Sequence, residues 1–331
     1  MTRTPEPQVA DGRAVARQHL LDELVAAGLV PAATSTAGRV RCVDTSRSNP
    51  SFLVTVDGAP TLFVKSQTAS IYGDAKSTLA HETVVQRMLT ADPATSSLAP
   101  RAMRLLPTGV LVSEAVAPAI GYGEAMLSAR SVHSARQLGV AIARLHRSTT
   151  DWCLPQRMPW VIDVEHGWTL GVEHDAIDRI QAAVFADDVL LPALHRVRDD
   201  WRATCVIHGD LKWDNVMVRH SGEVVLVDWE LAATGDPRWD IAALCAAHRA
   251  AGALDAQYCD PSAMRHLLAL IAGAYEFHGG EPWNADELRP WVSARLLEHA
   301  VLLAVTRPDY SAAPAQLIAL ARGLAGGSEP W

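Results

Sequence analysis

Several features that would place the chain in a familiar class are missing. It contains no run of 18 apolar residues and no basic-then-apolar start with a cleavage site, so we expect no membrane-spanning segment, no secretion signal and a cytoplasmic location. The five cysteines form no C-x-x-C pair and show no metal-ligand spacing, which predicts reduced thiols. No stripe of Lys or Arg is visible, so we expect no nucleic-acid partner.

Glycine-rich phosphate loops are missing as well. The sequence has no G-x-x-x-x-G-K-[ST], which excludes a P-loop fold as the source of phosphate binding. Between Val40 and Phe52 it has no G-x-G-x-x-G either, only the Ser-rich turn 44–51. Amides and hydroxyls of such a turn can still cap phosphates. Ser46 and Arg47 are therefore candidate nucleotide contacts, although a plain exposed hairpin loop explains Arg47 equally well.

Polar residues with a particular spacing stand in the C-terminal half. Residues 208–215 read His-Gly-Asp-Leu-Lys-Trp-Asp-Asn, and the apolar run 224–227 is followed by Asp-Trp-Glu. An Asp, an Asn five residues later and a second Asp at the exit of a strand can hold magnesium on a triphosphate and aim a hydroxyl at it. An ordinary turn before a buried strand would explain the first four residues alone, but not the whole set.

Each of these residue types suits one part of phosphoryl transfer. Asp210 is the candidate base, or orienting group, for an acceptor hydroxyl. Asn215 and Asp228 offer the hard oxygen ligands that Mg²⁺ prefers. Lys212 would place a compact positive charge over the γ-phosphate. The sequence therefore predicts ATP and Mg²⁺ as cofactors.

The two segments resemble the catalytic and metal-binding loops of the aminoglycoside phosphotransferase and choline kinase superfamily. The similarity continues in residues 235–242, Gly-Asp-Pro-Arg-Trp-Asp-Ile-Ala, which look like that family's Gly-Asp-Pro-x-x-Asp-Leu-Ala segment. The resemblance implies that Asp240 braces the catalytic loop, with His208 as structural support. Taken alone, Asp236 is the N-cap of a helix with Pro237 at its first position.

A kinase-like fold also needs a small N-terminal lobe, and the upstream sequence fits one. The apolar runs 52–56 and 61–65 flank Asp-Gly, which predicts a β-hairpin. Lys65 closes the second strand, where a kinase keeps the lysine that contacts the α- and β-phosphates. Glu82, in a helix predicted over 77–89, is the expected partner of Lys65. A solvated helix charge is the alternative explanation for Glu82.

Lysine usage supports this interpretation independently. Only three of the 29 basic side chains are lysines, namely Lys65, Lys76 and Lys212. A chain that otherwise uses arginine has thus kept lysine at both positions where a kinase places an ammonium on phosphate, and the planar guanidinium is not an equivalent substitute there. Lys76 shows that the preference is not absolute.

The sequence predicts an α+β fold of two lobes, like that of protein kinases. The N-lobe would have a small antiparallel sheet with one main helix, and the C-lobe would be large and mainly helical. At the hinge, main-chain groups around Glu114 and Val116 would take the adenine edge. The expected parts are a disordered N-terminus at 1–12, a nucleotide-binding lobe at 13–113, the hinge at 114–118, and a helical lobe at 119–331 with its catalytic loop at 206–216 and metal-binding loop at 224–230.

Charge is divided unevenly between the two predicted lobes. Residues 1–113 carry 11 basic and 9 acidic side chains, a net of +2, so with −8 for the whole chain the remainder carries −10. An acidic acceptor lobe would attract a cationic substrate, such as an amino sugar, an amine alcohol or a basic peptide. A surface kept acidic for solubility explains the same charge.

The sequence therefore leaves more than one acceptor open, and it also leaves an alternative to kinase activity. The phrases at 46–49, 62–65 and 77–82 look similar to phosphotransferase-like proteins of bacterial peptide natural-product pathways. That resemblance implies phosphorylation of Ser or Thr in a precursor peptide, followed by elimination by a partner lyase. The alternative to an active kinase is a catalytically weak, pseudokinase-like subunit that binds a peptide or a partner enzyme. Activity is favoured because the full inventory is present: Lys65, Glu82, Asp210, Asn215 and Asp228.

Overall fold

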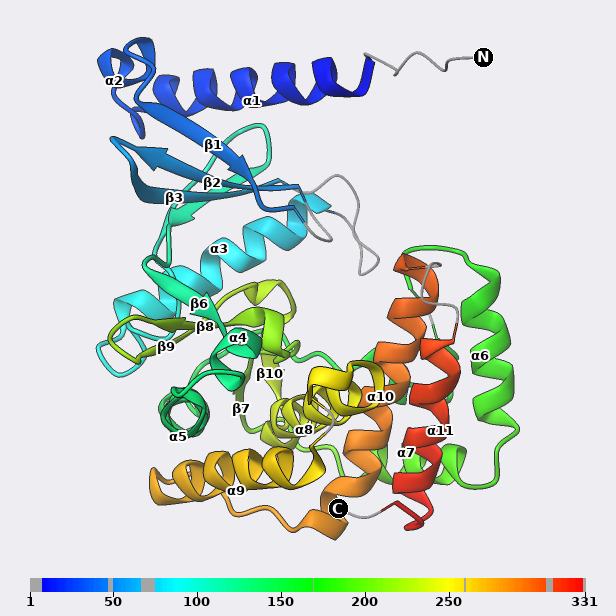
Figure 1. The fold of residues 1–331 in the computed structure, drawn as a ribbon. Coiled ribbons are helices and arrows are strands. Elements are labelled where there is room, and N and C mark those ends of the chain that lie inside the picture. Colours follow the sequence, from blue (N-terminus) through cyan, green and yellow to red (C-terminus); the bar gives the residue numbers. More distant parts are fainter. Residues whose placement is uncertain are drawn as a thin grey trace. The chain divides into compact units, whose positions relative to one another are not determined.

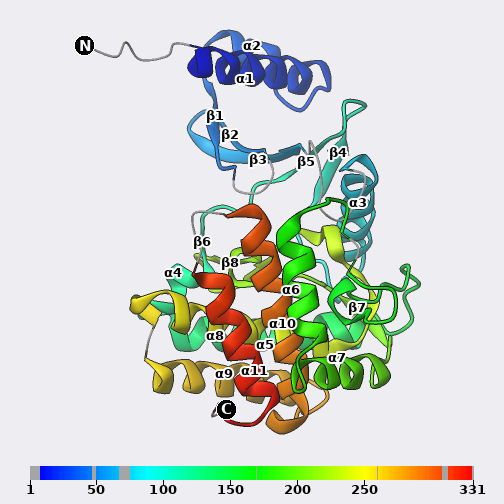
Figure 2. The same ribbon diagram turned by 90° about the vertical axis from the view of Figure 1, so that its right-hand side faces the viewer.

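The computed structural model describes residues 8–46, 50–66, 75–168, 170–258, 260–307 and 312–329. The chain divides into two compact units (Figures 1 and 2). The N-terminal unit comprises residues 1–68 and 101–117, and the large unit comprises residues 69–100 and 118–331. No helix within the described ranges is both long and apolar enough to cross a membrane.

The N-terminal unit is built on a five-stranded antiparallel sheet with the order β1-β2-β3-β5-β4. Asp57 and Gly58 join β2 to β3 with φ values of 53° and 83°, the positive-φ backbone that two-residue Asp-Gly hairpin turns adopt. The predicted hairpin is therefore confirmed. The strands are β1 (Val40–Asp44), β2 (Ser51–Val56), β3 (Ala59–Ser66), β4 (Ala102–Leu105) and β5 (Val110–Glu114).

Two helices precede this sheet, α1 (Gln8–Ala26) and α2 (Ala32–Thr36). Leu20 and Leu24 of α1 join the apolar side chains of the sheet in one small core. The disorder expected for residues 8–12 is wrong, because α1 begins at Gln8. Both prolines that suggested disorder lie before that residue, and no later proline interrupts the helical hydrogen bonds. Residues 1–7 lie outside the described part of the chain.

The large unit contains α3 (Ala75–Ala91), which the sequence had placed with the N-terminal lobe. Val85 and Leu89 of this helix are fully buried in the large core, together with Leu98. Because this apolar face is buried in the large core, α3 belongs to the large unit. The predicted lobe boundary at residue 113 had placed it in the N-terminal lobe instead.

Two small antiparallel sheets of the large unit carry the loops of interest. One has the order β6-β8-β9 and the other pairs β7 with β10. Strands β7 and β9 are buried throughout, as the apolar run at 224–227 led us to expect for β9, whereas β6 is half-buried. The strands are β6 (Ala119–Gly121), β7 (Cys205–Ile207), β8 (Val216–Arg219), β9 (Val224–Leu226) and β10 (Ala233–Gly235).

Helices make up most of the rest of the large unit, as predicted. Helix α10 runs alongside α11 in both views (Figures 1 and 2). The helices are α4 (Tyr122–Met126), α5 (Ser131–Ser148), α6 (Asp175–Phe185), α7 (Leu190–Asp199), α8 (Pro237–Leu254), α9 (Pro261–Phe277), α10 (Ala285–Thr306) and α11 (Ala313–Ala325).

Candidate active site

The loop that begins at His208 leaves β7 through a conformation that requires glycine. Gly209 has a φ of +81°, in the left-handed region that disfavours residues with a Cβ. A Cβ on Gly209 would also lie 2.4 Å from the carbonyl oxygen of Leu231. The backbones of these two segments can therefore approach this closely only because residue 209 has no side chain.

Asp240, in the first turn of α8, accepts hydrogen bonds from the start of this loop. Its Oδ2 accepts from the backbone N–H of His208 at 2.8 Å, and its Oδ1 accepts from that of Gly209 at 3.0 Å. His146 Nε2 lies 3.2 Å from the same Oδ2. Burial opposes ionisation, but the hydrogen bond from His146 and the charges and donors around it keep the pKa of Asp240 below its ordinary value. The carboxylate thus binds the backbone at the start of the loop.

His208 connects the catalytic loop to the metal-binding loop. Its Nδ1 accepts from the backbone N–H of Asp210 at 3.4 Å, and its Nε2 lies 3.0 Å from the carbonyl oxygen of Val227. These contacts fit a neutral ring with its proton on Nε2. Burial lowers the pKa of His208, which favours the same neutral form.

Asp210 is surrounded by positive and hydrogen-bonding groups. Its Oδ2 accepts from Lys212 Nζ at 2.6 Å and from Asn215 Nδ2 at 2.9 Å. Its Oδ1 lies 3.5 Å from Nη2 of Arg295. Burial opposes the charge, but Lys212 and Arg295 lower the pKa of this carboxyl group below its usual value. Asp210 is therefore an ionised carboxylate that accepts hydrogen bonds from both neighbours.

Lys212 pairs with Asp210 in this structure. Burial opposes its charge, but the adjacent carboxylate raises the pKa of the ammonium. Its side chain as a whole remains 42% exposed. The sequence suggested a role over the γ-phosphate, and the ion pair places that charge directly beside the candidate base.

The sequence did not identify Arg295 and Glu298, two buried residues of α10. Arg295 donates to the carbonyl oxygen of Gly209 at 3.2 Å and to Glu298 Oε2. Its guanidinium carbon lies 4.8 Å from the ring centroid of Trp239. The sequence did contain a signal for this pair: two opposite charges lie three residues apart inside the mainly apolar stretch 291–301. Charges that are buried in such a stretch need partners.

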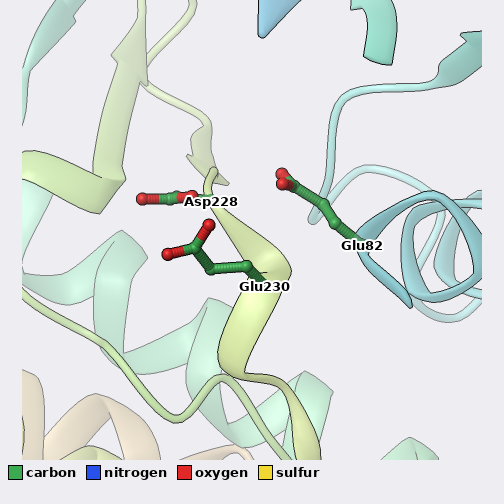
Figure 3. Close-up of side chains that lie close together, drawn as sticks. All are labelled: Glu82, Asp228 and Glu230. Carbon is green, nitrogen blue, oxygen red and sulfur yellow. The ribbon is translucent and has the colours of Figure 1, made fainter. Parts of the chain in front are cut away.

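Three carboxylates gather where β9 ends (Figure 3). Asp228 and Glu230 lie on the segment after the strand, and Glu82 reaches them from α3; one ligand oxygen of each lies within 4.8 Å of the others. Asp228 has a φ of 68°, a left-handed conformation that is uncommon outside glycine. Such local strain typically occurs at sites where a side chain must be aimed. The sequence had named Asp228 as a ligand but had not selected Glu230.

These oxygens fit a hard divalent cation such as Mg²⁺. Asn215 is compatible with the same role, because both of its amide protons are directed to Asp210, to the carbonyl oxygen at 2.8 Å and to Oδ2 at 2.9 Å. Its amide oxygen is then the atom that it can offer to a metal. Glu82 Oε1 also accepts from the backbone N–H of Trp229 at 3.3 Å, which ties α3 to the metal-binding loop.

The other predicted nucleotide contacts belong to the N-terminal unit. Lys65 is buried near the end of β3, only 5% exposed. The Ser46 hydroxyl accepts from the backbone N–H of Ser51 at 2.9 Å, so it closes its own loop. Glu114 ends β5 and forms an exposed ion pair with Arg101, and Val116 follows it. Arg47 lies outside the described residues.

The tryptophans next to the loops pack against the protein core. Trp229 and Trp239 are almost fully buried. The Trp229 indole donates to the carbonyl oxygen of Leu226 at 2.9 Å, and the Trp213 indole donates to His248 Nδ1 at 3.2 Å. These contacts fix both loops against the core.

Comparison with known protein families gives one decisive match. Residues 40–270 match the model of the phosphotransferase enzyme family, and this range contains both loops described above. The chain belongs to this family. It is therefore a phosphotransferase, and the superfamily inferred from the loop sequences is confirmed. No curated protein matches the chain.

Solved structures of other phosphotransferases share the fold. A choline/ethanolamine kinase family protein from Mesorhizobium loti aligns with a TM-score of 0.60 at 19% identity, over 93% of this chain and 94% of that one. Choline kinase LicA from Streptococcus pneumoniae aligns at 0.59 and 14%, over 94% and 99%. Aminoglycoside phosphotransferase APH(3'')-Id from Streptomyces rimosus, in complex with ADP and streptomycin, aligns at 0.52 and 17%, over 89% and 98%. The two-lobed, protein-kinase-like fold predicted from the sequence is confirmed.

Proposed function

We propose that this phosphotransferase moves the γ-phosphoryl group of ATP to a hydroxyl group of an amino sugar, an amine alcohol, or a Ser or Thr of a precursor peptide. The observation that carries the proposal is the environment of Asp210. Its carboxylate is kept ionised by Lys212 and Arg295, and it shares a hydrogen bond with Asn215. This arrangement suits a group that receives the proton of an alcohol during transfer.

In the proposed reaction, the acceptor oxygen attacks the γ-phosphorus. A bond forms between them as the bond from the γ-phosphorus to the β–γ bridging oxygen breaks, and ADP leaves. The hydroxyl proton passes to Asp210, while the Lys212 ammonium stabilises negative charge beside it. Asn215 and the carboxylates of Asp228 and Glu230 would hold Mg²⁺, which supplies charge neutralisation on the phosphates when bound.

Residues of the N-terminal unit, together with Glu82 of the large unit, have the remaining proposed roles. We assign Lys65 to the α- and β-phosphates, with Glu82 as the residue that positions it. Ser46 and Arg47 would contact phosphate from the Ser-rich turn, and the main chain around Glu114 and Val116 would take the adenine edge. If the acceptor is a peptide, a partner lyase would consume the phosphorylated product.

The experiment is a transfer assay with ATP, Mg²⁺ and three acceptor panels: amino-sugar antibiotics, amine alcohols and Ser/Thr peptides. Mass spectrometry would show the added phosphate. We expect one panel to be phosphorylated by the wild type and not by the Asp210→Asn variant. Binding of Mg·ATP without phosphorylation of any acceptor would reject the proposal and favour a pseudokinase-like binding subunit.

A further inference from the structure

The Arg295 guanidinium is held in one place by several different partners. It donates to the carbonyl oxygen of Gly209 and to Glu298, and it stacks over the ring of Trp239 at 4.8 Å. Arg295 and Glu298 are each only 7% exposed on their side chains. A planar guanidinium with this many contacts has little freedom left, so its charge is fixed relative to the catalytic loop.

The contact between Arg295 and Asp210 differs from the other contacts of this carboxylate. Lys212 and Asn215 both bind Oδ2 at 2.6 and 2.9 Å, whereas Arg295 Nη2 is 3.5 Å from Oδ1. Charge-assisted hydrogen bonds are normally about 2.7–2.9 Å long. At 3.5 Å the guanidinium attracts Oδ1 without occupying it as a close hydrogen-bond donor would.

We propose that Arg295 is a positioning residue for the acceptor, turning Asp210 so that Oδ1 faces the incoming hydroxyl, and that Glu298 keeps Arg295 from closing onto that oxygen. The inference rests on the proposed transfer to a hydroxyl group. The proposal gives α10 a role in the reaction, although the residues of α10 lie far from the catalytic loop in the sequence.

Stabilisation of the fold does not explain why the Arg295–Glu298 ion pair is buried here. Two charges in a buried helix face pay a desolvation penalty, and well-packed apolar residues in their place are often neutral or stabilising. Glu298 shows this penalty, because burial raises its pKa above the ordinary value despite the neighbouring Arg295. The pair is better explained by the position that it gives to a catalytic carboxylate.

The test compares Arg295→Met, Arg295→Lys and Glu298→Gln with the wild type. Arg289→Met is the matched control, since Arg289 lies on the same helix and pairs with Asp286 at 2.9 Å. Each variant is measured for acceptor kcat and KM, for Mg·ATP affinity by calorimetry, and for its melting temperature. A crystal structure of Arg295→Met shows the orientation of Asp210.

We expect Arg295→Met to lower kcat by about 10- to 100-fold, as misplacement of a reacting group by about 1 Å can do. Mg·ATP affinity should stay within about twofold of wild type, and Arg295→Lys should recover part of the rate. Glu298→Gln should also lower kcat. In the double variant with Asp210→Asn, loss of Arg295 should cost nothing further, because it acts through Asp210.

Three results would overturn the inference: an unchanged kcat in Arg295→Met, full additivity in the double variant, or an Asp210 carboxylate that keeps its orientation in the crystal structure. A fall in kcat that merely follows a lower melting temperature, without recovery in Arg295→Lys, also counts against it. If the wild type phosphorylates no acceptor, the proposed function fails. The orientation of Asp210 in Arg295→Met still decides whether Arg295 positions it.

Discussion

Asp210 has two oxygens with different surroundings, and this difference gives the sharpest test of its role. Oδ2 is bound by Lys212 and Asn215, while Oδ1 lies 3.5 Å from Arg295 Nη2. Asparagine keeps the size of the side chain but cannot accept a proton. We expect Asp210→Asn to slow transfer by about 10²- to 10⁴-fold, the range usual for loss of a general base.

Mg·ATP affinity should stay unchanged in this variant, because the proposed role of the side chain is to contact the acceptor and not the nucleotide. Single-turnover transfer and calorimetry measure the two effects separately. Turnover equal to that of the wild type would remove Asp210 from the mechanism.

The backbone of Asp228 affects how its metal role should be tested. Its φ of 68° is tolerated better by Asn than by Ala, because short polar side chains adopt left-handed conformations more readily. Asp228→Ala would therefore combine strain with loss of a ligand. Asp228→Asn removes the charge while keeping a compatible backbone.

We expect both Asp228 variants to weaken Mg²⁺-dependent ATP binding, the alanine variant more strongly. Calorimetric titration with Mg·ATP and with ATP in EDTA separates metal-dependent from metal-independent binding. Equal Mg·ATP affinity in wild type and Asp228→Asn would show that this carboxylate does not bind the metal.

At the scale of the elements, helix α8 stabilises the catalytic loop through the hydrogen bonds that Asp240 accepts from it. The lowered pKa means that this carboxylate stabilises the fold fully above the unfolded value of about 3.9. The contribution disappears as the pH falls through the lower folded pKa. We expect Asp240→Asn to lower the free energy of unfolding at pH 7, with the gap to wild type shrinking below about pH 4.

Urea denaturation between pH 7 and pH 2 checks this prediction. Asp286→Asn is the control, because that carboxylate is 81% exposed and surface ion pairs contribute little. A gap that stays constant down to pH 2 would mean that Asp240 is not the titrating group.

The elements also show what a sequence can and cannot reveal. Asp210 and Asn215 lie in one short loop and Asp57-Gly58 in one turn, so local spacing and turn chemistry were enough to find them. Arg295 reaches the loop only because α10 packs beside it, and Glu82 meets Asp228 only because α3 packs on the large core. Such contacts depend on tertiary packing, which periodicity within a single helix does not encode.

For the whole molecule, the uneven charge leads to a prediction about the acceptor. Residues 114–331 carry a net charge of −10, against +2 for residues 1–113. If the acidic part guides a cationic acceptor, the acceptor KM should rise with ionic strength while the KM for ATP changes much less. The reason is that salt at about 0.15 M screens charges beyond roughly 8 Å.

Initial rates measured between about 0.02 and 0.5 M salt would test this effect, because the Debye length falls from about 20 to about 4 Å over that range. A neutral acceptor from the same panel serves as the control. A flat acceptor KM would leave solubility as the explanation of the acidic charge.

The contact between α10 and the catalytic loop has a consequence for synthesis on the ribosome. Asp210 is made 85 residues before Arg295, which at 5–20 residues per second is a delay of about 4 to 17 s. After residue 230 has been added, the nascent chain carries both loops but still lacks the guanidinium beside them. The phosphotransferase would therefore reach its final carboxylate geometry only late in translation.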